Sequence, residues 1–423
     1  MEKFFQELLS KYNLKQEIHE TLQTAYKEAH QIWEPISEIT ALNQLKILQA
    51  FQKNRATDFH LHGSTGYGYG DTGREVLEDV WADIFKSEKA LVRPQIASGT
   101  HAIALCLYGI LKPNDEFISI SGMPYDTLQK VIGTHGETGT LSELNIVHKT
   151  IDLKEDGDFD FEGIRKSITP KTKMICIQRS RGYSWRPSLT IKQISKAIGF
   201  VKTINPNIIC FVDNCYGEFV ELEEPTQVGA DLVAGSLIKN PGGGITPRGG
   251  YIVGKEHLVY QAACRLTAPG IADDVGSALD FNRPAFQGLF LAPLIVEQAL
   301  KGAIFTSLLF SKLRYQVSPE PKEFRTDIIQ AIKLGSAERM RAFSRGIQKA
   351  SPLDSYVTPV ESLLPGYEDS VIMAGGTFVQ GSSIELSVDG PLREPYIIYL
   401  QGGLSLSHVL IGAVLALKEL GCV

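Results

Sequence analysis

The sequence has no excess of positive charge and no cysteine pair with metal-ligand spacing. Its 423 residues carry a net charge of −6, whereas a surface that binds nucleic acid needs clustered basic residues. None of the six cysteines forms a Cys-x-x-Cys pair, which argues against a zinc site or a redox pair of that type. His60 and His62 have metal-like spacing but no suitable acidic or thiol partner, so no metal site is predicted.

Long apolar runs are also missing. A membrane-spanning helix needs about eighteen or more consecutive apolar residues, and we find no such run. The first twenty residues are charged and amphipathic, and they lack the apolar core and small-residue cleavage site of a signal peptide. The cysteines lie mostly in apolar contexts and are interpreted as reduced thiols. These absences predict a cytoplasmic protein without a membrane or nucleic-acid partner.

What the sequence does contain is an alternation of short apolar runs with helical segments. Seven apolar runs lie between residues 89 and 254, and several are separated by amphipathic helices of ten to fifteen residues. This alternation predicts an α/β fold with a mainly parallel sheet covered on both faces. We therefore expect a three-layer αβα large domain over residues 51–293, preceded by a helical segment over residues 1–50.

The pattern changes after about Pro293. A helical stretch over residues 294–313 is followed by two segments with strand-like alternation, residues 377–389 and 395–401, and by a C-terminal helix. A smaller C-terminal α+β domain over residues 294–423 is the prediction for this half of the chain.

One candidate anion site lies where the first of these apolar runs leads into a helix. The segment Ala-Ser-Gly-Thr places Ser98, Gly99 and Thr100 at the helix N-terminus, where free backbone N–H groups and the helix dipole favour a phosphate. The same residues also form an ordinary helix cap, and by themselves they indicate a cap more strongly than a phosphate site.

Three further residues lie at or near strand ends and could meet at the carboxyl edge of the sheet, where open α/β sheets bind ligands. Asp213 ends one apolar run, and Lys239 follows it by 26 positions, a gap that fits one loop and one more strand. A buried lysine is unfavourable unless it is engaged, which favours a chemical role for the amine. Ser236, just before the lysine, could offer a hydroxyl to a phosphate.

Tyr125, at the start of the helix after the second run, is either a core aromatic or a ring that stacks on a flat cofactor. Pyridoxal 5′-phosphate requires a Schiff-base lysine, a partner for its pyridine nitrogen and a phosphate cup. Lys239, Asp213 and the Ser-Gly-Thr segment together match these needs. The sequence therefore predicts a pyridoxal-phosphate site.

At this point the sequence resembles the fold-type I pyridoxal-phosphate enzymes. More closely, it is similar to the methionine gamma-lyase-like or aluminium-resistance proteins, relatives of cystathionine beta-lyase. The resemblance covers nearly the whole chain and is carried by GYGYGDTGRE, QIASGTHA, GMPYDTL, FVDNCYGEFVE, GSLIKNPGGG and LSVDGPLREPY. It implies an aspartate-aminotransferase-like large domain and a carbon–sulfur lyase that acts on a sulfur-containing amino acid by β- or γ-elimination.

The resemblance also implies roles for individual residues. Lys239 would bind the cofactor aldehyde, Asp213 the pyridine nitrogen, and Tyr125 would stack on the ring and assist proton transfer. The remaining cofactor ligands would be Ser98, Gly99, Thr100 and Ser236. A tyrosine from a neighbouring subunit would reach the phosphate, with Tyr69 as the first candidate and Tyr67 as the second. A homodimer or homotetramer with a shared active site is the implied assembly.

The chain also departs from the related lyases. They carry an arginine shortly after the phosphate-binding tyrosine, whereas Asp71 stands near that place and Arg74 lies beyond it. In those lyases a hydroxyl residue precedes the catalytic lysine, whereas Ile238 occupies that position here. The arginine that binds the substrate carboxylate is replaced by Glu385 in this chain.

Arg393 is the best replacement for the missing substrate arginine, because a bidentate clamp needs a planar guanidinium, and Arg179 is the next choice. These departures leave other functions open. An aminotransferase would use the same cofactor residues, and a stress-related binding protein could retain the cofactor without catalysis.

Overall fold

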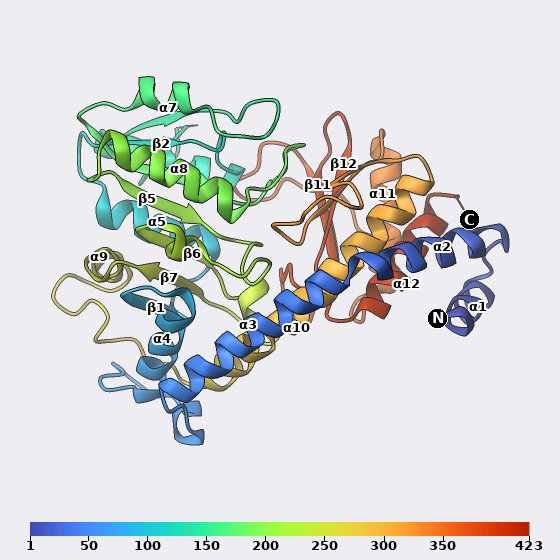
Figure 1. Cartoon of the computed structure of the whole chain (residues 1–423), viewed down its shortest axis with the longest axis horizontal. Helices are drawn as coiled ribbons and strands as arrows, with labels where there is room; N and C mark the ends of the chain where they lie inside the picture. The colour runs from blue at the N-terminus through green and yellow to red at the C-terminus, as the bar shows by residue number, and fades with distance from the viewer. Residues whose placement is uncertain (135, 423) are drawn as a thin grey trace. The chain divides into compact units, whose positions relative to one another are not determined.

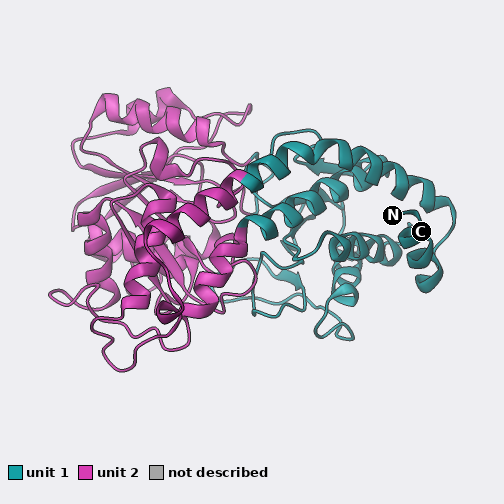
Figure 2. Ribbon diagram, turned by 60° about the horizontal axis from the view of Figure 1, so that its bottom comes forward, with its two compact units in different colours: residues 1–41, 183–187, 293–423 teal, residues 42–182, 188–292 magenta. Residues whose placement is uncertain are grey.

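The computed structural model describes residues 1–134 and 136–422 and divides them into two units (Figures 1 and 2). The first unit, which is magenta and labelled unit 2 in Figure 2, contains residues 42–182 and 188–292. The second unit, which is teal and labelled unit 1 in Figure 2, contains residues 1–41, 183–187 and 293–423. Two long helices, α3 (Glu34–Lys53) and α10 (Asn282–Lys312), each contain one of the boundaries between the units.

The first unit is built on a seven-stranded sheet with the strand order β1-β7-β6-β5-β4-β2-β3. Its strands are β1 (Lys89–Arg93), β2 (Glu116–Ser119), β3 (Val147–Thr150), β4 (Thr172–Gln178), β5 (Ile209–Asp213), β6 (Leu232–Ser236) and β7 (Gly250–Gly254). The strands from β2 to β6 pair in parallel, whereas β7 runs antiparallel to both β1 and β6. The mainly parallel sheet predicted from the sequence is therefore confirmed.

Among the described residues, six α-helices lie wholly within this unit: α4 (Thr72–Phe85), α5 (Gly99–Ile110), α6 (Asp126–Ile132), α7 (Phe161–Ser167), α8 (Ile191–Ile204) and α9 (Glu256–Leu266). Successive residues of β7 show that both faces of the sheet are covered. Tyr251 packs against the rings of Trp81 and Phe85 in α4 at 4.7 and 5.5 Å, while Ile252 joins the cluster formed with α5 and α9. Neighbouring strand residues point to opposite faces, so the three-layer αβα architecture follows.

The second unit contains a five-stranded antiparallel sheet with the order β10-β11-β12-β9-β8. These strands are β8 (Gln316–Ser318), β9 (Gln330–Lys333), β10 (Val371–Ala374), β11 (Ser387–Pro391) and β12 (Ile397–Gln401). Helices α1 (Glu2–Tyr12), α2 (Glu17–Ile32), α11 (Ala337–Ala350) and α12 (Leu406–Glu419) belong to the same unit. The predicted smaller α+β part is confirmed.

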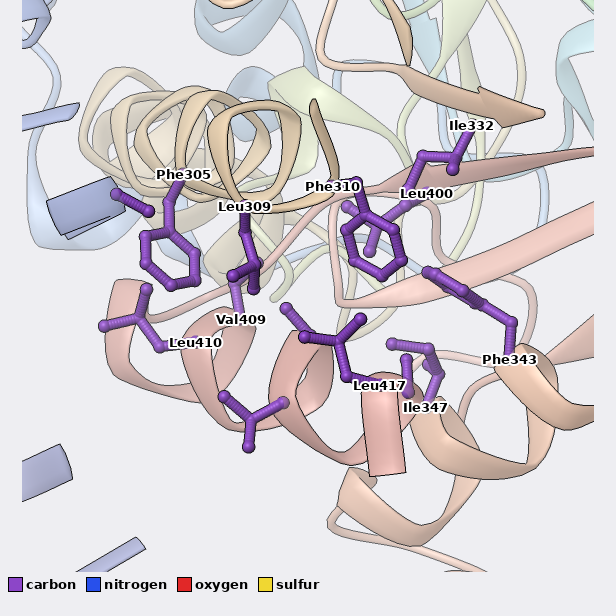
Figure 3. Packing of buried hydrophobic residues seen from close by; sticks show 14 of the residues in the cluster. Phe305, Leu309, Phe310, Ile332, Phe343, Ile347, Leu400, Val409, Leu410 and Leu417 are labelled. Carbon is purple, nitrogen blue, oxygen red and sulfur yellow. The ribbon is translucent and has the colours of Figure 1, made fainter. Parts of the chain in front are cut away.

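The core of this second unit joins helices and sheet through one buried cluster. Phe305 and Phe310 of α10, Phe343 of α11 and Leu400 of β12 all belong to it (Figure 3). Phe5 of α1 stacks on Phe305 with their ring centroids 6.5 Å apart. The N-terminal helix is therefore fixed by aromatic packing.

Helix α10 differs from its prediction in two respects. It begins at Asn282, twelve residues before the expected start, and it carries Pro293 inside the helix. Part of it also has the length and hydropathy of a membrane span, although 67% of that window is buried inside the protein. This burial is typical of a core helix.

Candidate active site

Lys239 lies three residues beyond the end of β6, just before a short 3₁₀-helix, η4 (Asn240–Gly242). Its Nζ atom lies 3.9 Å from the centroid of the Tyr216 ring. Burial by itself lowers the pKa of the amine. The surrounding acidic groups of Cys215, Tyr216 and Asp213 outweigh this effect and raise the pKa above its usual value. In the chain by itself, Lys239 is therefore a cation held next to an aromatic face.

Asp213 is the last residue of β5 and is 6% exposed. The backbone N–H of Cys215 donates to its Oδ1 at 3.1 Å. Burial raises the pKa of this carboxyl, while the positive charge of Lys239 opposes the shift. A further cation beside Asp213 would favour the ionised form, which is the environment that a protonated ring nitrogen supplies.

The N-terminus of α5 lies against the end of β6. Ser98 caps the helix, because its Oγ accepts the His101 N–H at 3.0 Å. A Cβ on Gly99 would come within 3.3 Å of the Ser236 Cβ, so glycine permits this close approach. The side chain of Ser98 thus serves the ordinary capping role, and the backbone at Gly99 lies beside Ser236.

Tyr125 occupies the position before α6 and is partly buried. Its hydroxyl donates to Thr100 Oγ1 at 3.0 Å, and its backbone N–H donates to Gln178 Oε1 at 3.2 Å. Burial raises the pKa of the phenol, and the negative charge of Asp213 adds to that shift. Tyr125 therefore stays protonated at neutral pH.

The structure therefore brings most of the predicted site together at the carboxyl edge of the sheet. The predicted residues in this cluster are Ser98, Gly99, Thr100, Tyr125, Asp213, Ser236 and Lys239. Sequence reasoning did not identify Cys215, Tyr216 or Gln178, which also line it. Their only signal is position: Cys215 and Tyr216 lie two and three residues after Asp213, and Gln178 ends the neighbouring strand.

Tyr67 and Tyr69 lie in the glycine-rich loop before α4 and are 77% and 64% exposed. Their rings lie 5.9 Å apart. Buried side chains hold the loop: Arg74 Nη1 donates to the carbonyls of Gly68 and Gly276 at 2.8 Å each. Asp71 accepts from the backbone N–H groups of Ser64, Arg74 and Ala278. The two exposed tyrosines therefore project from a firmly held loop.

The two candidate substrate arginines have different environments. Arg179 is fully buried and donates to Asn214 Oδ1 at 2.8 Å and Glu221 Oε1 at 2.9 Å. Arg393 belongs to the other unit, where its half-exposed side chain pairs with Asp369 at 2.8 Å. Arg179 is thus buried among its partners, whereas the side chain of Arg393 is half-exposed and pairs with Asp369.

Within residues 1–134 and 136–422, no group of three His, Cys, Asp or Glu side chains could hold a metal ion. His60 Nδ1 instead accepts the Thr57 N–H at 3.1 Å. The histidine thus takes part in a local turn.

A mainly parallel sheet with a lysine and an aspartate at adjacent strand ends defines the fold-type I class of pyridoxal-phosphate proteins. The chain belongs to the methionine gamma-lyase family, because the sequence model of that family matches residues 18–421. This finding confirms the family resemblance drawn from the sequence. Family membership implies pyridoxal phosphate as cofactor and supports a lyase.

Close relatives span nearly the whole chain. An uncharacterised protein from Bacillus subtilis is 51% identical over 380 residues, which are 89% of this chain and 90% of that protein. A structure named a carbon–sulfur lyase involved in aluminium resistance, from Clostridium novyi, has a TM-score of 0.94 at 46% identity, covering 98% of each chain. A Listeria monocytogenes structure has a TM-score of 0.93 at 51% identity, covering 95% of this chain and all of that one. The name of that structure describes a cystathionine beta-lyase involved in aluminium resistance.

The residues present fit the implied cofactor. Lys239 Nζ has no hydrogen bond or ion pair with any residue in the described parts of the chain, so no such partner has to be displaced when the deprotonated amine is attached to the cofactor. Burial raises the pKa of the Asp213 carboxyl, and a cationic ring nitrogen next to it would stabilise its ionised form. The absence of a Cβ at Gly99 lets the N-terminus of α5 approach Ser236, so the two proposed phosphate-binding segments lie together.

Proposed function

We propose that this protein is a pyridoxal-phosphate-dependent carbon–sulfur lyase that acts on a sulfur-containing amino acid by β- or γ-elimination. The observation that carries the proposal is the electrostatic interaction of the Lys239 amine with the buried Asp213 carboxyl, in a chain matched to the methionine gamma-lyase family over residues 18–421. The name of the Clostridium novyi structure supports the same reaction class.

When bound, the cofactor supplies an aldehyde that binds amines and a protonated ring that accepts the electrons released at the substrate Cα. Asp213 keeps the proton on the ring nitrogen. The Gly99 and Thr100 backbone, with the Ser236 hydroxyl, binds the phosphate. Lys239 would hold the cofactor aldehyde, and its free amine would be the base that removes the substrate Cα proton.

Tyr125 is the proposed proton donor to the departing sulfur, because its phenol stays protonated and is oriented by Thr100. Each amino acid then consumes one water and gives one thiol, one 2-oxo acid and one ammonium ion. Arg393 is the proposed ligand of the substrate carboxylate. Its ion pair with Asp369 is half-exposed, and such pairs contribute little, so a carboxylate can replace Asp369.

The purified protein is expected to release a 2-oxo acid without any added 2-oxo acid, together with a thiol from cystathionine or methionine and hydrogen sulfide from cysteine. Replacing Arg393 with alanine should raise KM about tenfold or more with a smaller effect on kcat, because the arginine binds the unreacting carboxylate. Both products are measured in the same reaction. Dependence on an added 2-oxo acid would indicate an aminotransferase, and a visible band that no amino acid changes would indicate a binding protein.

We also propose that the active site is shared between two copies of the chain, with Tyr69 reaching the partner's phosphate site and Tyr67 as the alternative. The firmly held loop and the exposed tyrosines support this proposal. A fixed loop with exposed aromatic tips is suited to an interface, where tyrosine is enriched.

Complementation tests the shared site. Tyr69→Ala and Lys239→Ala are each expected to have little activity, whereas co-expression of the two should restore part of it, because the hybrid contains one intact site. Tyr67→Ala with Lys239→Ala is the matched comparison. Inactive hybrids, together with full cofactor affinity in both tyrosine variants, would exclude the shared site.

A further inference from the structure

An aromatic ring, and no hydrogen bond, contacts the amine of Lys239. Nζ lies 3.9 Å from the centroid of the Tyr216 ring, and within the described residues it makes no hydrogen bond or ion pair. A ring face attracts a cation without fixing the directions of its N–H groups. Tyr216 can therefore hold the nitrogen in place without a directional hydrogen bond.

The backbone of Tyr216 adopts a conformation that large residues rarely take. Its φ is 72°, in the left-handed region that favours glycine. The next residue, Gly217, donates its N–H to Asn214 O at 2.9 Å, and a Cβ on Gly217 would lie 2.6 Å from the Arg179 side chain. The surrounding structure thus imposes this conformation on a bulky side chain, and such strain often marks a functional site.

Asn240 ties the ring to the lysine. Asn240 follows Lys239 in the chain and is completely buried, and its Nδ2 donates to the carbonyls of Tyr216 and Glu218 at 3.0 Å each. Tyr216 is thus held at two points: its ring contacts the Lys239 nitrogen, and its carbonyl accepts a hydrogen bond from Asn240, the residue after Lys239. Loss of the Asn240 hydrogen bonds is therefore expected to change the position of the ring relative to the amine.

We propose that Tyr216 is a positioning residue that holds the Lys239 nitrogen and favours its positively charged form, and that Asn240 keeps Tyr216 in place. This inference rests on the proposed function, since it concerns the same lysine. It adds an energetic role for two residues to which the proposed reaction assigns no proton transfer and no phosphate contact. The ionisable groups facing the amine are those of Asp213 in β5, Cys215, Tyr216 and Glu218 in the following loop, and Tyr125 before α6.

The test is the pH midpoint of the visible absorption band of the full-length, cofactor-loaded protein. Tyr216→Phe keeps the ring and should leave the midpoint within a few tenths of a unit. Tyr216→Gly removes the ring and relieves the backbone strain, so its midpoint should fall by roughly one unit while its melting temperature does not fall. A purely structural role predicts the reverse, with stability changed and the midpoint constant. An unchanged midpoint in Tyr216→Gly overturns the proposal.

Asn43 offers a matched control for Asn240. It is also buried, and its Nδ2 donates to the carbonyls of Phe219 and Glu221 at 3.1 Å each, in the same segment. Asn240→Ala and Asn43→Ala should lose comparable stability, but only Asn240→Ala should lower the midpoint. Equal midpoints in the two variants would contradict the role of Asn240.

This readout needs cofactor but no elimination activity. A wild-type protein that binds the cofactor and releases no thiol would contradict the proposed function and still report the effect of Tyr216. A wild-type protein that releases thiol, with equal midpoints in all variants, would overturn the Tyr216 proposal alone.

Discussion

Replacing Lys239 with alanine is expected to abolish thiol release, with a loss on the order of a thousandfold or more. One amine both attaches the cofactor and removes the Cα proton in the proposed reaction, so no other group can compensate. The variant should also lose the visible band at the cofactor concentrations that saturate the wild type. Absorption spectra and initial rates of thiol release measure the two effects.

Lys255 provides the control for this substitution. It also follows a strand end directly, after β7, but its ammonium pairs with Asp231 at 2.6 Å and its side chain is about half exposed. Lys255→Ala should therefore keep the band and the activity. Borohydride reduction of the wild type followed by peptide mapping should label Lys239. A label on another lysine, or activity in Lys239→Ala, would contradict the assignment.

The positions of the strands in the first unit were predictable, because each buried strand is a short apolar run bounded by polar or glycine-rich residues. The direction of β7 was not. An apolar run carries no information on strand direction, and only its pairing with β1 and β6 shows that it is antiparallel. The segment over residues 377–389 is a clearer failure, since strand β11 begins only at Ser387.

The side chain of Glu385 explains that failure. Its two carboxylate oxygens accept the backbone N–H groups of Phe378 and Val379 at 2.8 and 2.9 Å. Donors that a strand would offer to a neighbouring strand are instead taken by a side chain within the same loop. The residue that replaces the expected substrate arginine thus has a visible structural role.

Lys239 and Asp213 were predictable as site candidates for a general reason. Charged residues at the ends of apolar strands are unfavourable unless they are engaged, and parallel strands bring their carboxyl ends to one edge. Tyr216 and Asn240 carry no such signal. Their proposed roles depend on a positive φ and on hydrogen bonds to a segment more than twenty residues away, and both arise only in the folded chain.

Replacing Asp213 with asparagine is expected to lower kcat/KM by roughly a hundredfold or more without unfolding the protein. The amide keeps the shape of the carboxyl and can still accept the Cys215 N–H, but it no longer holds a proton on the ring nitrogen. The cofactor then accepts electrons from Cα less readily, so the chemical step slows. Steady-state kinetics with the preferred amino acid measure the loss.

The pH dependence of stability distinguishes the Asp213 carboxylate from a carboxylate that stabilises the fold. The folded pKa of Asp213 is raised by burial, so its ionised form destabilises the cofactor-free fold as pH rises through the interval between the ordinary and the raised pKa. Asp213→Asn should therefore flatten this part of the profile of stability against pH. The free energy of unfolding at neutral pH should stay constant or rise.

Asp231 is the contrasting carboxylate, just before β6. Burial acts to raise its pKa, but the Cys210 N–H and the ammonium groups of Lys202 and Lys255 lower it overall, so its stabilising effect is present at neutral pH and is lost as pH falls through the lowered pKa. Asp231→Asn should cost about 1–3 kcal/mol of stability at neutral pH and leave kcat nearly unchanged. Chemical denaturation measures the stability of both variants, and steady-state kinetics measure their activity. If Asp213 serves the reaction, Asp213→Asn loses activity and keeps its stability, whereas Asp231→Asn loses stability and keeps its activity. An Asp213→Asn variant that is unstable yet fully active would refute the role of Asp213.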